Sequence, residues 1–215
     1  MFHNRIAMNK THFIFLFVSL LLFSCKKENE HQPRKTTGKI NTISVIIDDQ
    51  FWNGEIGDSI RNKFASPVIG LPQEEPLFNI NQYPVRLLEG FMTDTRAIIV
   101  VKKAEENKFE IKKNQYASPQ NVFHISGKTA ADIIACIEKN TPKMIETIKN
   151  CELAESQKIN SQSLIDPKVI ENKFHLSIQV TSGYAYVLQN SNFLWLKKEI
   201  IGGNTSLLIY QVHLN

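Results

Sequence analysis

The sequence predicts an α+β fold with an antiparallel or mixed sheet, helices mainly on one face, a β-α-β start and one long Pro-kinked helix. Short β-branched segments bounded by Asp, Gly or Asn recur from Ile43 onward, which is typical of strands. An apolar pattern of helical period extends from Ser126 to about Ser156. Roughly 175 residues, from residue 40 to residue 215, are enough for one sizeable core, so we expect a single domain there.

The predicted β-α-β start begins with the strand Ile43–Ile47, whose nearly continuous apolar character indicates a central position in the sheet. Asp48-Asp49 follows, and fits either a cap of the next helix, which we favour, or an acidic or metal-binding pair. The helix is expected over Phe51–Ala65, because apolar side chains recur there every four residues. Its start should be irregular, since glycines weaken helices and two occur early, Gly54 and Gly57.

The segment Ser66–Met92 contains four prolines and shows no clean period of a helix or a strand. Long irregular segments in compact domains are usually functional or disordered. Several large apolar side chains lie within it, so we expect it to be ordered against the domain. We therefore predict an interaction loop at its centre, with these candidate contact residues: Leu71, Pro72, Gln73, Glu75 and Phe78.

The rest of the chain alternates predicted strands and helices. The expected strands are Ala97–Val101, Lys108–Lys112, Asn121–Ile125, Leu176–Val180, Tyr184–Leu188, Phe193–Lys197 and Leu207–Val212, with the last hairpin turn at Gly202-Gly203-Asn204. A short helix is expected over Asp166–Lys173, with Asp166 as its N-cap. In the long helical stretch, Thr141-Pro142 permits either a Pro-kinked helix or two successive helices, and the unbroken apolar register favours the kinked one.

The N-terminus predicts an export signal and a lipid anchor. Residues 1–24 have a basic start and an apolar run, Phe13–Phe23, that is too short to cross a bilayer. Leu22-Phe23-Ser24-Cys25 resembles a bacterial lipobox, which implies lipidation of Cys25 and attachment to the outer membrane; an ordinary cleavage site is the alternative. Residues 25–39 are almost devoid of apolar side chains and read as a flexible tether.

Scattered motifs then resemble one family of Bacteroidota lipoproteins that is known only as a domain of unknown function. The specific part is Leu71-Pro72-Gln73 followed by Glu75-Pro76-Leu77-Phe78, with weaker matches at Asp48-Asp49, Arg96 and Ala117-x-Pro119-Gln120. The resemblance implies a lipid-anchored protein of the cell envelope, on the periplasmic side or the cell surface. Members of the family continue further, so we expect this chain to be a C-terminally truncated member.

Composition argues against nucleic-acid binding. The formal net charge is only +4, and Arg5 and Lys10 of the signal contribute two of these charges. Of the three cysteines, Cys136 and Cys151 would be about 22 Å apart on one helix, too far for a disulfide, and we expect two buried free thiols. We expect no cofactor and no metal site, because the chain has no hydrolase elbow, zinc-protease motif, Walker loop or dinucleotide fingerprint.

Three functions remain after these exclusions. The first is a non-catalytic interaction or assembly module that binds an envelope protein through the predicted loop. The second is a binder of small ligands, glycans or peptides, that uses Trp52 or the pair Phe193 and Trp195. The third and least favoured is a hydrolase, with carboxylates drawn from Asp48, Glu55, Asp58 and Glu75. His124 fits a general base, but no nucleophile frames it, so a structural role is preferred.

Overall fold

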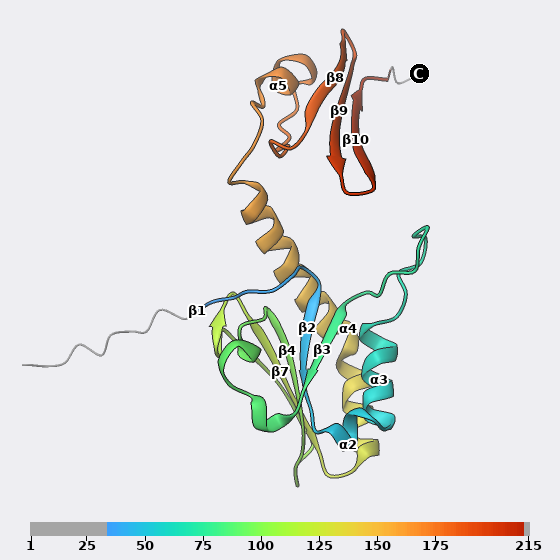
Figure 1. The fold of residues 1–215 in the computed structure, drawn as a ribbon, viewed down its shortest axis with the longest axis vertical. Coiled ribbons are helices and arrows are strands. Elements are labelled where there is room, and N and C mark those ends of the chain that lie inside the picture. The colour runs from blue at the N-terminus through green and yellow to red at the C-terminus, as the bar shows by residue number, and fades with distance from the viewer. Residues whose placement is uncertain (1–33, 213–215) are drawn as a thin grey trace, which may run out of the picture. The chain divides into compact units, whose positions relative to one another are not determined.

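The computed structural model describes residues 34–212, and it confirms the α+β fold class (Figure 1). Its larger sheet has five strands in the order β3-β2-β4-β7-β5. All neighbours in it are parallel except β5 and β7, which are antiparallel, so the sheet is mixed. The bounds are β2 Thr42–Ile46, β3 Asn79–Tyr83, β4 Ala97–Lys103, β5 Lys108–Lys113 and β7 Asn121–Gly127.

The β-α-β start is formed by β2, two helices and β3. Helix α2 spans Asp49–Trp52 and α3 spans Glu55–Phe64, so the predicted helix is interrupted near its start, as expected. The interruption has a steric cause at Gly57, where a Cβ atom would lie 1.8 Å from the backbone oxygen of Trp52. Only glycine permits this close approach between the two helices. Asp48 is the N-cap residue of α2, although its side chain makes no capping hydrogen bond.

The core lies between the sheet and two helices, α3 and α4 (Ala130–Asn160), that cover the same face (Figure 1). Alternate strand residues point toward these helices, among them Ile43, Ile99 and Phe123. The opposite face carries a smaller cluster that includes Ile98 and Val100. The segment between β3 and β4, with its two 3-10 turns η1 (Val85–Leu87) and η2 (Gly90–Thr93), contributes Val85 and Leu88 to that second cluster.

Helix α4 is continuous over Ala130–Asn160 and contains Pro142. One long helix is therefore present, and the alternative of two helices is wrong. A capping box starts it, because Thr129 accepts a hydrogen bond from the amide of Asp132 and donates its own amide to that carboxylate. The buried positions recur every three or four residues along its length: Ile133, Ile137, Thr141, Met144, Ile148, Glu152 and Glu155.

Residues 163–212, called the second unit below, pack around a hydrophobic cluster of their own. The single domain expected over residues 40–215 stays a prediction. Helix α5 (Lys168–Phe174) accompanies a three-stranded antiparallel sheet in the order β10-β9-β8. Its strands are β8 Ala185–Asn190, β9 Phe193–Ile200 and β10 Gly203–Tyr210, so the last hairpin turns at Ile201-Gly202, one residue earlier than predicted.

One predicted strand is absent from the structure, and one strand of the larger sheet was not predicted. Leu176–Val180 is not a strand: one isolated bridge joins Thr181 to Leu164, while Ile178 and Val180 turn into the hydrophobic cluster. Strand β3 was not predicted, because it lies inside the proline-rich segment and includes Asn79 and Asn81. As an edge strand it needs hydrogen bonds on one side alone, and β2 provides them in parallel register.

Residues 34–39, assigned to the tether from their composition, lie against the domain. Strand β1 (Arg34–Lys35) pairs in parallel with β6 (Ala117–Ser118). Arg34 also forms an ion pair with Asp94 at 3.2 Å. Backbone pairing and polar contacts hold this segment, which explains why an argument from apolar burial did not identify its order.

Candidate functional site

The predicted interaction loop is an arm, residues 66–78, that projects from the end of α3 and returns to β3 (Figure 1). Its two sides are joined by backbone hydrogen bonds from Leu77 to Ser66 and from Val68 to Glu75, both 2.9 Å long. A bridge opposes Pro67 to Pro76. The arm is thus built like a short hairpin, and backbone pairing fixes its base.

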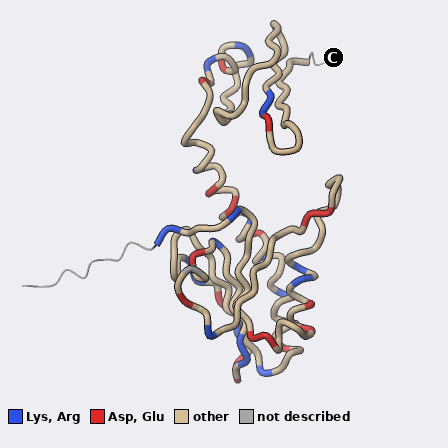
Figure 2. The backbone as a smooth tube through the Cα atoms, viewed as in Figure 1, with Lys and Arg blue, Asp and Glu red and all other residues tan. Residues whose placement is uncertain are grey.

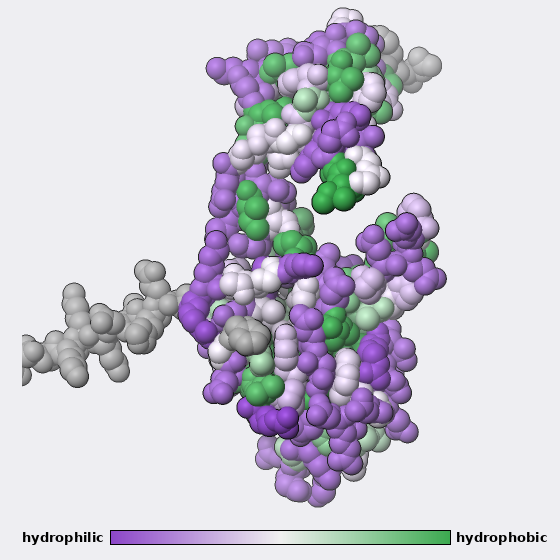
Figure 3. All heavy atoms as spheres, in the orientation of Figure 1, coloured by the Kyte–Doolittle hydropathy of each residue, from purple (hydrophilic) through white to green (hydrophobic). Residues whose placement is uncertain are grey.

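The tip of the arm exposes apolar side chains to solvent. Ile69 is 100% exposed, Leu71 is 45% exposed and Val68 is 37% exposed. Gly70 lies between the two most exposed of these residues at φ +93°, a backbone conformation that favours glycine. Figure 3 shows apolar and hydrophilic residues side by side on the arm. Ile69 was not among the predicted contact residues, although an isolated Val-Ile pair between Pro67 and Gly70 was a visible signal.

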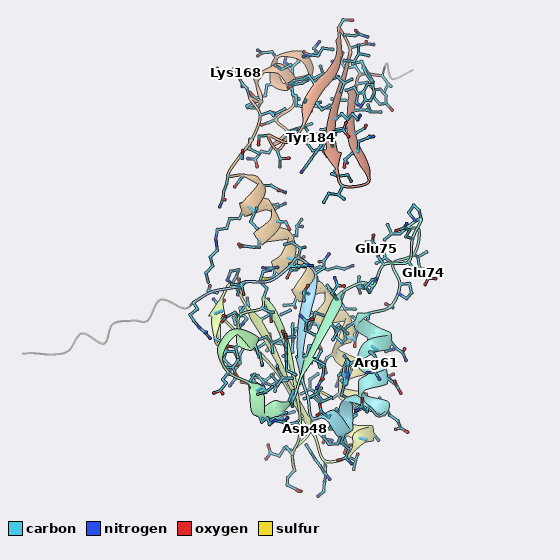
Figure 4. All side chains as sticks on the ribbon, in the orientation of Figure 1. Asp48, Arg61, Glu74, Glu75, Lys168 and Tyr184 are labelled. Atoms are coloured by element: carbon cyan, nitrogen blue, oxygen red, sulfur yellow. The ribbon has the colours of Figure 1, made fainter. Side chains whose placement is uncertain are left out.

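The structure divides the predicted contact residues into two groups. Leu71, Pro72, Gln73 and Glu75 are exposed on the arm, and Figure 4 shows Glu74 and Glu75 there. Phe78 is 1% exposed and belongs to the main core. Phe78 therefore anchors the base of the arm, and it is not available to a partner.

The four carboxylates considered for a hydrolase are not gathered at one place. Figure 4 places Asp48 and Glu75 at opposite ends of α3. Asp58 lies on α3 itself, where it pairs with Arg61 at 2.7 Å. The neighbouring Asp49 accepts a hydrogen bond from Gln82 at 3.1 Å. Of the four candidates, Glu55 and Asp58 share the first turn of α3, whereas Asp48 and Glu75 lie apart from each other.

The two tryptophans differ in what covers them. The guanidinium of Arg61 lies 4.5 Å from the ring centroid of Trp52, and the ring packs partly against the core. Trp52 is therefore already stacked. Trp195 lies on the face of β9 opposite its buried neighbours Leu194 and Leu196, and its indole donates a hydrogen bond to Ser206 at 3.1 Å.

A buried ion pair that the sequence did not suggest joins Arg96, the residue before β4, to α4. Arg96 Nε donates to Glu152 Oε1 at 2.9 Å, and both side chains are at most 6% exposed. Arg96 also donates to the backbone oxygens of Gly38 and Lys39, and Glu152 accepts from the amide of Asn41. The pair thus fastens residues 38–41 to the core. The one hint in the sequence was that Arg96 is among the weaker matches to the Bacteroidota lipoprotein family.

The cysteines of α4 are free thiols, as expected, but they are half-buried and not buried. Burial raises the pKa of both thiols, and nearby Glu152 raises that of Cys151 further. They are therefore weak nucleophiles at neutral pH. Cys25, the predicted lipidation site, lies outside the described residues.

Residues 34–212 contain neither a candidate metal site nor a candidate membrane-spanning helix. No group of three or more His, Cys, Asp or Glu side chains in this range is arranged to hold a metal ion. None of its helices combines the length and apolar character that crossing a bilayer requires.

Comparison with known proteins gives two family matches. Residues 36–161 match a family described as a domain of unknown function, DUF8532, and residues 163–215 match a second such family, DUF4837. Searches of curated proteins and of solved structures found no match. The expectation of a family of unknown function is confirmed, and the first match covers more than half of the 215 residues. The chain therefore belongs to the family of the domain of unknown function DUF8532.

Proposed function

We propose that the protein is a lipid-anchored protein of the cell envelope that binds another envelope protein through its arm, without catalysis. The observation that carries this proposal is the exposed apolar tip on an ordered arm. A side chain as exposed as Ile69 contributes nothing to its own fold. Burying an Ile or Leu side chain in a partner contributes roughly 1.5–3 kcal/mol, so two such residues are enough to anchor an interface.

The arm also indicates what kind of partner fits it. Glu74 and Glu75 lie beside the apolar tip, so a complementary surface is an apolar pocket bordered by basic side chains. The hydrogen bonds across the arm and its prolines lower the conformational entropy that binding would cost. Most of the free energy gained by burying the tip is therefore available for binding the partner.

The location in the envelope rests on the sequence. The basic start, the apolar run and the lipobox-like Leu22-Phe23-Ser24-Cys25 support export and lipidation, as in the Bacteroidota lipoproteins that the chain resembles. Replacement of Cys25 by Ser should abolish incorporation of a radiolabelled fatty acid and release the protein from the membrane fraction. Retained label would refute the anchor and leave the arm untouched.

The arm is tested by site-specific photo-crosslinking in the native envelope, with the crosslinker at Gln73. We expect one dominant crosslinked protein, and its loss in an Ile69→Ser/Leu71→Ser variant. The matched control is Ile201→Ser, because Ile201 is equally exposed but lies at the β9–β10 turn. A crosslink that survives the arm variant, or is lost in the control, would refute the arm as the contact.

Ligand binding by the second unit is an alternative that one observation favours. On the outer face of its sheet, Trp195 lies opposite Leu208, and Phe193 lies opposite Tyr210. Flat aromatic surfaces of this kind suit the rings of glycans or the side chains of peptides. A change in Trp fluorescence on adding envelope glycans or peptides, absent in Trp195→Phe and kept in Trp52→Phe, would support it. If the fluorescence changes in neither the wild-type protein nor the Trp52→Phe variant, ligand binding at Trp195 is excluded.

A further inference from the structure

The face of the five-stranded sheet away from α3 and α4 has a hollow of about 260 Å³ over β5, β7 and β4. The register aligns its side chains in rows. Lys108 lies opposite Ser126, which lies opposite Lys102. In the next row Glu110 lies opposite His124. Because these residues are two apart along each strand, their side chains share one face.

The hollow has an excess of positive charge. Four lysines line it, and Glu110 is its one carboxylate. Glu110 pairs with Lys108 at 2.9 Å and with Lys112 at 3.9 Å. Lys102 lies on this face of β4 and forms no ion pair within residues 34–212, so its ammonium group remains for a ligand. Figure 2 shows basic residues at the end of the sheet where β4 leads into β5.

The pKa of His124 is consistent with an excess of positive charge in the hollow. Its Nε2 lies 2.7 Å from Oε1 of Gln115, whose amide in turn donates to the hydroxyl of Tyr116. Burial is the largest cause that lowers the pKa of His124, and Lys112, Lys102 and Lys108 lower it further, whereas Glu110 opposes them. The lysines therefore outweigh the glutamate at this point.

We propose that this hollow binds the phosphate group of an anionic ligand. A phosphate monoester carries about −1.5 to −2 charges, which would largely neutralise the excess positive charge. Lys side chains bind phosphate as point charges, and His124 is a further polar group lining the hollow. The hydroxyl of Ser126 already donates to the backbone oxygen of Glu106 at 3.0 Å. The volume suits a phosphate with a small substituent. The site lies on a sheet face, apart from the arm, and does not depend on the arm's proposed role.

The test uses His124 as an internal probe. Its imidazole is titrated by NMR in the folded protein, without ligand, with inorganic phosphate, and with vesicles of phosphatidic acid, whose headgroup is a phosphate monoester. A bound phosphate adds negative charge beside Lys102, Lys108 and Lys112, so it should raise the pKa of His124. Phosphatidylcholine vesicles are the control for the membrane surface.

The lysines are tested with a matched pair of variants. Lys102→Gln/Lys112→Gln should weaken phosphate binding roughly fivefold, the scale of two exposed charge pairs. Lys63→Gln/Lys149→Gln removes the same charge from α3 and α4, which cover the other face, and should change binding little. A shift with both probes supports a general phosphate site, and a shift with vesicles alone assigns a lipid headgroup. No shift with either probe, or equal weakening in both double variants, would overturn the proposal.

Discussion

At the scale of single residues, the buried pair of Arg96 and Glu152 dominates the polar interior of the larger unit. Removing two charges from water is costly, and here the cost is offset by the mutual contact and by hydrogen bonds to residues 38, 39 and 41. The sequence could not reveal the pair, because Glu152 looks like an ordinary surface residue near the end of a long helix. Its burial depends on a segment more than 110 positions earlier in the chain.

Breaking this pair from either side should be strongly destabilising. Arg96→Met or Glu152→Gln leaves one buried charge without its partner, so we expect a loss of about 3–5 kcal/mol of unfolding free energy. Arg96→Met/Glu152→Leu should cost less than the sum of the single losses. Urea denaturation measures these values.

The control for the buried pair is Glu138→Gln. It removes a solvent-exposed ion pair with Lys63, 3.8 Å long, and should cost at most about 1 kcal/mol. A loss below about 1 kcal/mol for Glu152→Gln would show that the buried contact contributes little.

At the scale of elements, most strands and all three longer helices follow from local patterns. Strands β2 and β4 are rich in β-branched residues, and the buried face of α4 repeats at helical spacing. Strand β3 and the order of residues 34–39 could not be predicted from local patterns, because their stability comes from backbone pairing with distant segments. The arm was located from its prolines, but which of its residues are exposed depends on its hairpin-like pairing.

Pro142 is the exception within α4. It has no amide hydrogen for the oxygen of Glu138, and nearby carbonyls receive side-chain donors: Thr141 to Ile137 at 2.7 Å, and Asn140 to Cys136 at 2.8 Å. Pro142→Ala restores the missing hydrogen bond and should stabilise the protein by about 1–3 kcal/mol. The midpoint of thermal unfolding measures it. A lower midpoint would mean that packing of the helix requires the proline.

At the scale of the whole molecule, residues 34–160 and 163–212 have separate hydrophobic clusters and match separate families. Each cluster also has its own tryptophan nearby, Trp52 in the first unit and Trp195 in the second. The second unit is small, and small units bury a lower fraction of their surface. Its stability should therefore be the lower of the two.

Unfolding of the chain from residue 26 onward should thus occur in two transitions. In urea, the fluorescence of a Trp52→Phe variant should report the earlier transition, and that of a Trp195→Phe variant the later one. Circular dichroism should show both. Coincident midpoints for the two variants would instead show one cooperative unit.

The pairing of β1 with β6 has a mechanical consequence. A force applied to the chain from its N-terminal side meets Arg34–Thr37 first, and these residues are held by a short strand, backbone hydrogen bonds and an exposed ion pair. Peeling them away would lengthen the free chain by about 13 Å. The force would then reach Gly38 and Lys39, whose backbone carbonyls accept hydrogen bonds from the buried side chain of Arg96. The contacts of Arg34–Thr37 would thus break first. The five-stranded sheet would bear the force only after they had broken.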